Sequence, residues 1–326
     1  MYVFYETSKR WLVLFLLMSA ALWRPVLAFD VAEAVAQLYW QDERSGKTIA
    51  TFIAPPVQTQ SIVTHPSGGT WRVAGSGDFN GDGFTDLYWR DENTGANVIE
   101  LWRGTQFLDS VKNSVIPMSA GWYINAIADF TGDGHDDVLW RHVSSGEVWM
   151  HQILSGELVA SVQVTAIRDI SWNIQLTPDL DGDGKADILL RHHQTGVVWR
   201  FLMDGHQIID SRRFMNAAPH WQLALHGDFD ADGDDDLLWR NTQNGQSVIH
   251  RVKGGDFSRH GMYSLGILDD MHWQPVWARD LDDDGDDDII WHHDRLGYSS
   301  VYLLGSTGYI GQLLPSLAEG GWRPVH

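Results

Sequence analysis

A nine-residue acidic loop occurs five times in this 326-residue chain and constrains its fold more than any other feature. The copies begin at residues 78, 129, 179, 228 and 280, so successive loops are 49 to 52 residues apart. Each copy has oxygen-bearing side chains at positions 1, 3, 5 and 9 and a glycine at position 6. A short backbone with this spacing of oxygens can wrap a hard cation such as calcium. A period of about 50 residues is typical of a propeller, a solenoid or another repeat array.

The loops predict about five calcium sites, one in each repeat. The expected ligands are Asp78, Asn80, Asp82 and Asp86 in the first loop, Asp129, Thr131, Asp133 and Asp137 in the second, Asp179, Asp181, Asp183 and Asp187 in the third, Asp228, Asp230, Asp232 and Asp236 in the fourth, and Asp280, Asp282, Asp284 and Asp288 in the fifth. An EF-hand is excluded, because position 12 is a Trp or Leu instead of the bidentate Glu. The alternative is an acidic turn without metal, which five copies in one register disfavour.

Two variations among the loops affect the expected affinities. The last three loops carry four carboxylates each and are expected to bind calcium more tightly than the first two, which carry three. Position 4 is Ala231 in the fourth loop and Asp283 in the fifth, where the other loops have Gly. We therefore expect unequal calcium affinities rather than a different fold.

The sequence around each loop predicts four short antiparallel strands. A tryptophan stands seven residues before each loop, and an apolar strand, a turn ending in glycine and two further strands follow it. Four strands in about 50 residues make one blade of a β-propeller. Whole blades are expected at about residues 71–120, 121–170, 171–219, 220–271 and 272–320.

The two ends of the repeat region predict a sixth blade made from both of them. Residues 321–326 match only the first strand of a repeat, whereas Leu38–Glu43 aligns with Leu87–Glu92 at an offset of 49 residues. Residues 38–65 would supply three strands and residues 321–326 the fourth, which would leave no open sheet edge. We thus predict an all-β fold, a single six-bladed β-propeller over residues 29–326, with no calcium loop in the composite blade.

Residues 1–28 are expected to form a secretory signal peptide. Lys9 and Arg10 precede an apolar run, Trp11–Trp23, and Ala28 offers a small residue for cleavage. The run is shorter than the about 20 apolar residues of a membrane span, so we expect no span after cleavage; an uncleaved anchor is the alternative. The mature protein would be secreted or periplasmic, or associated with the cell surface. Because the chain has no cysteine, bound calcium would take the stabilising role of disulfides.

The formal net charge of −20 comes largely from the loops. No basic patch is evident, and binding to a phosphate backbone requires one. Nucleic-acid binding is therefore disfavoured, and we expect no nucleic-acid partner.

The 17 tryptophans allow two interpretations. Those that recur at fixed blade positions are expected to pack blade against blade, with the arginine that follows each one stacked on a ring. The alternative is that these Trp–Arg pairs, with carboxylates such as Glu100 or Glu147, line sugar pockets between blades. The arginines are Arg90, Arg141, Arg191 and Arg240, and the candidates for exposed sugar platforms are Trp102, Trp149, Trp199 and Trp277.

The tryptophan, the D-x-[DN]-x-D-G-x-x-D loop and the D-[LIV]-x-W-R strand resemble FG-GAP/VCBS-type repeats. Such repeats occur in the propellers of integrin alpha subunits, in exported bacterial proteins and in a calcium-containing fungal lectin. The resemblance covers essentially all of residues 29–326 and implies a calcium-bound propeller. It also implies partners on the face opposite the loops, as in integrins, or sugars between blades, as in the lectin. Leu190 and His292 depart from the pattern, where Trp and Arg are usual.

We expect a monomeric binding module rather than an enzyme. The first hypothesis is lectin-like carbohydrate recognition, and the second is an adhesion or scaffold protein that binds a protein through one face. A polysaccharide-acting enzyme is the third, disfavoured because the histidines form no recognisable nucleophile, zinc or acid/base motif. No catalytic residue and no cofactor other than calcium is predicted, and calcium is either structural only or regulatory.

Overall fold

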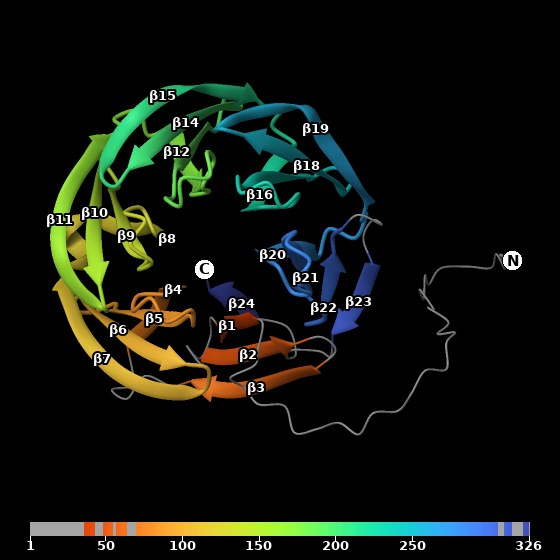
Figure 1. The fold of residues 1–326 in the computed structure, drawn as a ribbon. Coiled ribbons are helices and arrows are strands. Elements are labelled where there is room, and N and C mark those ends of the chain that lie inside the picture. The colour runs from red at the N-terminus through yellow and green to blue at the C-terminus, as the bar shows by residue number, and fades with distance from the viewer. Residues whose placement is uncertain are drawn as a thin grey trace, which may run out of the picture.

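Six four-stranded antiparallel sheets are arranged in a ring in the computed structural model (Figure 1). The structure describes residues 36–42, 48–54, 57–63, 70–305, 310–314 and 322–325. The predicted all-β six-bladed propeller is therefore confirmed. The predicted signal peptide lies outside the described residues.

Five blades follow one another along the chain. The first consists of β4 (Trp71–Gly77), β5 (Asp86–Asp91), β6 (Ala96–Arg103) and β7 (Gln106–Val115), and the second of β8 (Trp122–Ala128), β9 (Asp137–His142), β10 (Glu147–Leu154) and β11 (Glu157–Ala166). The third consists of β12 (Trp172–Leu176), β13 (Ile188–His192), β14 (Val197–Asp204) and β15 (Gln207–Asn216). The fourth contains β16 (Trp221–Gly227), β17 (Asp236–Asn241), β18 (Gln246–Lys253) and β19 (Asp256–Ile267), and the fifth β20 (Trp273–Arg279), β21 (Asp288–His293), β22 (Ser299–Leu303) and β23 (Ile310–Leu314). A short 3-10 helix, Met118–Ala120, joins the first two blades.

The sixth blade is built from both ends of the described chain, as predicted. Its strand order is β24 (Trp322–Val325), β1 (Ala36–Asp42), β2 (Thr48–Ala54) and β3 (Val57–Val63). The register pairs Tyr39 with Val325 and Asp42 with Trp322. In Figure 1 β24 lies beside β1 and closes the ring next to the first blade. The hydroxyl of Ser76 in β4 donates to the Val325 carbonyl oxygen at 3.2 Å, which ties this closure to the first blade.

The antiparallel order places the connections on two opposite faces. The acidic loops, between first and second strands, and the turns between third and fourth strands lie on one face, which we call the loop face. The turns between second and third strands and the connections between blades lie on the other, which we call the turn face. The first strand of each blade lies nearest the axis (Figure 1).

The core lies between adjacent blades. One apolar cluster, for example, joins Phe130 and Leu139 of the second blade to Ile188 and Leu190 of the third. The recurring tryptophans of the second strands, represented by Trp140, are at most 2% exposed and belong to such clusters. They therefore pack blade against blade and present no ring to a sugar.

Arginine stacking between blades is confirmed at three junctions. The guanidinium carbon of Arg90 lies 5.0 Å from the Trp140 ring of the next blade. Arg191 and Arg240 stack in the same way on the next tryptophans, Trp239 and Trp291, at 5.7 Å and 5.1 Å.

The predicted stacking between blades is wrong for Arg141. At another junction a histidine makes a comparable contact. The blade after Arg141 has Leu190 in place of the tryptophan, so no ring is available there. His292 stands at the arginine position of the fifth blade, and its ring centroid lies 4.4 Å from that of Trp40 in the composite blade. An aromatic contact thus replaces the cation–π contact at this junction.

Candidate functional site

The first aspartate of each acidic loop organises the loop backbone. In the first loop, Asp78 accepts hydrogen bonds from the backbone N–H groups of Gly81 and Gly83, both at 2.7 Å. Gly83 has φ +83°, a left-handed conformation that glycine adopts without steric cost. The glycines at this position in the other four loops have φ between +80° and +98°. The turn predicted at position 6 is therefore present in all five loops.

Position 4 of the loops is left-handed as well, and here two residues are not glycine. Gly81, Gly132 and Gly182 have φ near +70°, while Ala231 has φ +56° and Asp283 φ +61°. A Cβ atom in this region costs roughly 1–2 kcal/mol. The departures seen in the sequence thus correspond to strained backbone in the fourth and fifth loops.

The aspartate at position 9 is a buried link between its loop and the third strand. Its Oδ1 accepts a backbone N–H from that strand at 2.7–2.9 Å, as Asp86 does from Trp102. The other oxygen of Asp86 accepts the Phe79 N–H at 3.0 Å. Burial raises the pKa of Asp86 to about 8, and neighbouring loop carboxylates act in the same direction, whereas the backbone hydrogen bonds oppose them. These predicted ligands therefore also hold the blade together.

Burial acts on the equivalent carboxyls of the other loops in the same way. It raises the pKa of Asp187 and Asp236 to about 8, and that of Asp137 and Asp288 to about 7. Without a cation, these carboxyls are therefore partly protonated near neutral pH.

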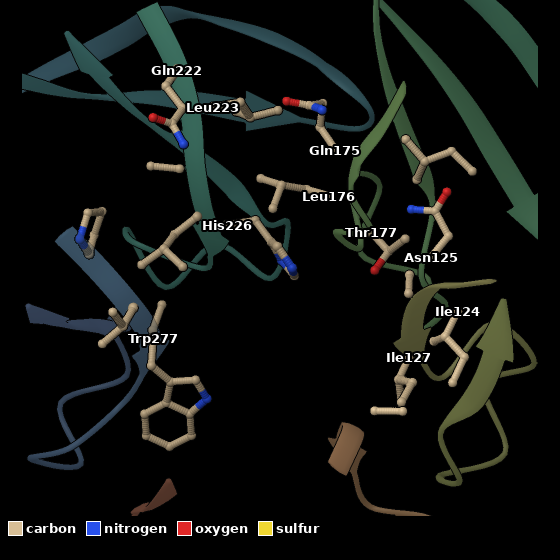
Figure 2. A pocket seen from close by; sticks show the side chains of 18 residues that line it. Ile124, Asn125, Ile127, Gln175, Leu176, Thr177, Gln222, Leu223, His226 and Trp277 are labelled. Atoms are coloured by element: carbon tan, nitrogen blue, oxygen red, sulfur yellow. The ribbon is translucent and has the colours of Figure 1, made fainter. Parts of the chain in front are cut away.

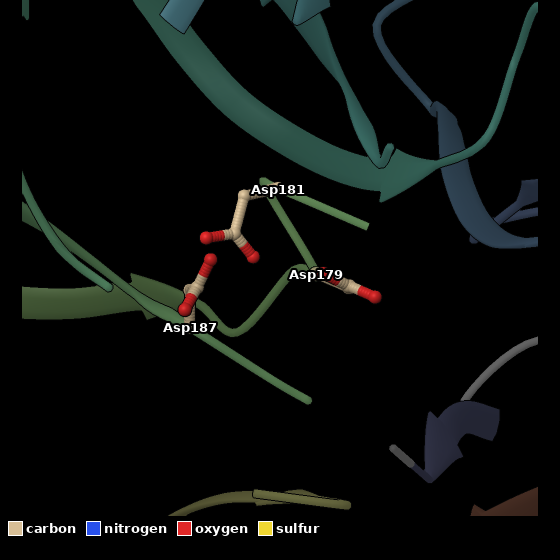
Figure 3. A group of neighbouring side chains, drawn as sticks. All are labelled: Asp179, Asp181 and Asp187. Carbon is tan, nitrogen blue, oxygen red and sulfur yellow. The ribbon is translucent and has the colours of Figure 1, made fainter. Parts of the chain in front are cut away.

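The structure brings several predicted ligands together. Carboxylate oxygens of Asp179, Asp181 and Asp187 lie within 4.8 Å of one another, and Figure 3 shows the Asp181 and Asp187 carboxylates facing each other. Carboxylate oxygens lie equally close together in two other groups of three, Asp228, Asp230 and Asp232 in the fourth loop and Asp280, Asp282 and Asp288 in the fifth.

The position-5 aspartates have a common role within the loops. Asp82 and Asp133 accept the backbone N–H two residues further on at 3.1 Å and 3.0 Å, and Asp183 and Asp284 do so at 2.9 Å and 3.1 Å. In the first two loops the position-3 side chains remain local. Asn80 accepts from the Asp82 N–H at 3.0 Å, and the Thr131 hydroxyl lies 3.4 Å from Asp129 Oδ1.

Several buried carboxylate oxygens in the loops have no hydrogen-bond partner among the described residues. They are Oδ2 of Asp137 and Asp236 and Oδ1 of Asp181 and Asp230. A buried carboxylate oxygen without a donor is costly, and a cation removes that cost. The residues present therefore fit a hard cation held by oxygen ligands.

Basic side chains reach two of the loops. Lys185 Nζ lies 3.4 Å from Asp183 in the third loop. In the fourth, Arg251 lies 3.1 Å from Asp230 and Lys253 lies 3.1 Å from Asp232. A calcium ion in the fourth loop would compete with Arg251 and Lys253 for these carboxylates. The number of carboxylates in a loop therefore does not by itself determine its calcium affinity.

Sequence reasoning missed that neighbouring loops are hydrogen-bonded to each other through position 8. The Asp136 N–H donates to the Asp78 carbonyl at 2.8 Å, and the Asp78 N–H donates back to Asp136 Oδ2 at 2.7 Å. Asp235 and Asp287 make the same double link to the preceding loop, whereas Ala186 makes only the backbone half. The Asp-Asp doublets at positions 8 and 9 were the available signal.

The four tryptophans proposed as exposed platforms are all half-buried. Trp149 packs edge-on against Trp122 at a junction between blades, and Trp199 packs against Trp172 in the same way at the next one. Trp102 packs against Phe107. Trp277 lines a cavity. The prediction of exposed rings is therefore wrong, because neighbouring side chains cover part of each ring.

That cavity lies on the propeller axis and has a volume of about 570 Å³. Five first strands enclose it, and Figure 2 shows His226, Trp277 and the amide side chains of Asn125, Gln175 and Gln222 around it. A further recess of about 430 Å³ lies against the first acidic loop. The two share Ile127, His226 and Trp277, so they are parts of one axial cavity.

A ring of six blades, five of which carry an acidic loop on the same face, defines a repeat β-propeller. The chain is an FG-GAP repeat protein, since residues 78–140 and 228–291 match the model of the FG-GAP-like repeat family and the propeller fold accompanies them. A comparison with curated proteins gives no match. Within the described residues, no helix is long and apolar enough to cross a membrane.

Solved structures share the fold at low sequence identity. An Agrocybe aegerita lectin, described as recognising non-reducing terminal N-acetylglucosamine, is 18% identical, with a TM-score of 0.57 over 89% of this chain and 85% of that one. A chain of the nidogen/laminin complex is 12% identical, with a TM-score of 0.52 over 89% and 98%. The Tc holotoxin pore of Photorhabdus luminescens is 15% identical, with a TM-score of 0.53 over 90% of this chain and 13% of that one.

Proposed function

We propose that this protein is an exported, calcium-binding propeller that serves as a carbohydrate-binding module. The buried carboxylate oxygens that lack a donor, such as those of Asp181 and Asp230, carry the calcium part of the proposal. Five ions would neutralise about half of the net charge of −20 and connect the first and second strands of five blades. The rigid ring that results would hold a ligand site without rearrangement, which lowers the entropic cost of binding.

Calcium binding can be tested by unfolding in calcium and in excess EDTA. We expect chelation to lower the melting temperature, because an ion that binds only the folded state stabilises it by about 2.7 kcal/mol at a hundredfold excess over its Kd. Calcium must displace protons from buried carboxyls such as Asp86, whose pKa is raised to about 8. The apparent affinity should therefore increase from pH 6 to pH 8. An unchanged melt in EDTA would exclude the metal assignment.

Half-buried tryptophans at the blade junctions support a carbohydrate ligand. Trp149 and Trp199 occupy equivalent positions in two successive blades, each held edge-on by a second ring. A fixed aromatic ring supplies an apolar surface at little conformational cost. The lectin with the same fold recognises terminal N-acetylglucosamine, so this sugar should be included among the first probes.

A glycan array in calcium and in EDTA tests the carbohydrate proposal. We expect selective binding in calcium and loss of binding in EDTA. A folded, calcium-loaded protein that binds no glycan would refute the proposal.

A protein partner is the second candidate, because apolar side chains are exposed on the turn face. Val115, Val143 and Ile170 are each more than 60% exposed there, and Leu296 and Tyr298 are about half-exposed. Clustered exposed apolar side chains commonly mark interaction sites. Cross-linking in the native envelope tests this candidate; a cross-linked protein that substitutions on the turn face release would favour it over the glycan.

A further inference from the structure

The axial cavity differs from the rest of the molecule because its lining does not repeat. Trp277 is the fourth residue after the first tryptophan of its blade, where the other whole blades have Gly75, Ala126, Leu176 and Leu225. His226 is the fifth residue after that tryptophan, where the others have Ser76, Ile127, Thr177 and Ala278. The acidic loops, in contrast, keep nearly the same residues in every copy. A recess with different groups on each side suits one asymmetric ligand per chain rather than one per blade.

The inner part of the cavity presents only uncharged hydrogen-bonding groups besides His226. Its described lining contains no carboxylate, lysine or arginine. The amides of Asn125, Gln175 and Gln222 each offer both a donor and an acceptor. Such groups match hydroxyls, which also donate and accept, and they provide no counter-charge for an ion.

An oriented imidazole and an aromatic ring complete the site. His226 Nδ1 lies 2.7 Å from Asp235 Oδ2, and the carboxylate also accepts the Asp179 N–H at 3.0 Å. The contact with the carboxylate orients the imidazole through Nδ1, and Nε2 remains as its second hydrogen-bonding atom. Figure 2 shows the His226 ring reaching toward the middle of the cavity and Trp277 on its wall. The two residues combine a polar contact with an apolar face, as a sugar ring requires.

We propose that the axial cavity binds one neutral sugar unit per chain, in contact with His226 and Trp277. This inference rests on the proposed carbohydrate function and places the site on the axis instead of at the blade junctions. The volume of about 570 Å³ is within the range of ligand pockets, roughly 300–1,000 Å³. The adjoining recess leads past the first acidic loop, so the rest of a glycan would leave the cavity toward the loop face.

Titration calorimetry of the calcium-loaded protein tests the inference. The probes are the methyl glycosides of glucose, galactose, mannose and N-acetylglucosamine, with methyl glucuronide as the charged counterpart. We expect a stoichiometry near one and preference for a neutral probe over the glucuronide. The variants Trp277→Leu and His226→Thr should each weaken binding at least tenfold. Both introduce a residue that another blade already has at that position, Leu176 or Thr177, so the fold should tolerate them.

Trp102→Leu is the matched control, because the Trp102 ring packs against Phe107 and does not line the axial cavity, so this change should leave the affinity unchanged. A stoichiometry of two or more, with binding lost when Trp199 is replaced by leucine, would overturn the axial site and leave the carbohydrate proposal standing. Binding that neither axial substitution affects would overturn it too. A glycan signal on the array with no binding of the five probes would also count against the axial site. No binding on the array or in solution would refute both proposals.

Discussion

Replacing Arg240 by methionine should destabilise the protein much more than the same change at Arg141. The Arg240 side chain is 1% exposed and stacks 5.1 Å from the Trp291 ring. It donates to the carbonyl oxygens of Leu268 at 3.0 Å and Gly245 at 3.2 Å. Removing the guanidinium leaves the Leu268 carbonyl without this donor, at about 1–3 kcal/mol, and loses about 1 kcal/mol of cation–π energy. The Gly245 carbonyl keeps the hydrogen bond from the Leu268 N–H at 3.0 Å. We expect a total loss of about 2–4 kcal/mol, partly offset where water reaches the Leu268 carbonyl.

Arg141 provides the matched comparison within the same chain. It is 3% exposed, but Leu190 stands at the tryptophan position of the next blade, and the hydrogen bond from Arg141 to the Ile167 carbonyl is 3.5 Å long. Arg141→Met should therefore cost about 1–2 kcal/mol. The variant Trp291→Leu gives the Arg240 junction the leucine that the Arg141 junction has, and a double-mutant cycle with Arg240→Met should show about 1 kcal/mol of coupling.

Urea unfolding in saturating calcium measures both effects, because it reports free energies under conditions in which the loops are equally occupied. Equal losses for Arg240→Met and Arg141→Met, together with zero coupling to Trp291, would show that stacking between blades contributes nothing. The junctions would then be held by apolar packing alone.

Three further predictions concern the ring closure, acid stability and loop strain. Deleting residues 322–326 should cost more than about 3 kcal/mol, since β24 closes the sixth blade; a thermal melt equal to that of the whole chain would contradict the closure. Burial lowers the pKa of His292 to about 4, so the unfolded chain takes up this proton first, and stability should fall between pH 6.5 and pH 4 by at most about 3 kcal/mol relative to His292→Gln. The free energy of unfolding should be measured for both proteins across this pH range; a constant difference between them would refute the prediction. Ala231→Gly should stabilise by about 0.5 kcal/mol and Gly132→Ala should destabilise by about 1 kcal/mol, because both positions have left-handed φ; urea midpoints that shift the other way would contradict the strain.

Features that repeat could be predicted from the sequence. The loop spacing, the first-strand tryptophan and the glycine turns are local patterns, and five copies in one register leave little choice of fold. Alignment of Leu38–Glu43 with Leu87–Glu92 was enough to predict the composite blade. The stacking of arginines on tryptophans was predicted from the same repeat pattern. That prediction was wrong at Arg141, because Leu190 replaces the tryptophan of the next blade.

Contacts between different blades at non-repeating positions could not be predicted. The bond between Asp136 and Asp78 needs two loops side by side, and the ligand pattern has no requirement at position 8. His226 and Trp277 differ from their counterparts in the other blades, so only the closed ring reveals that they share a cavity. The exposure of Trp149 depends on Trp122, 27 residues earlier in the chain, which hydrophobic patterning along one strand does not capture.

The closure between β24 and β1 also has a consequence for how the protein folds. β24 follows every other described strand in the chain, whereas its neighbour β1 precedes them all. During synthesis, β1 must wait for a partner that emerges after all the other described strands, while each of the other five blades can form from consecutive strands. Pairing over so long a separation is slow. Completion of the ring is therefore expected to be a late step of folding, and contacts that form only at this step would slow unfolding rather than speed folding.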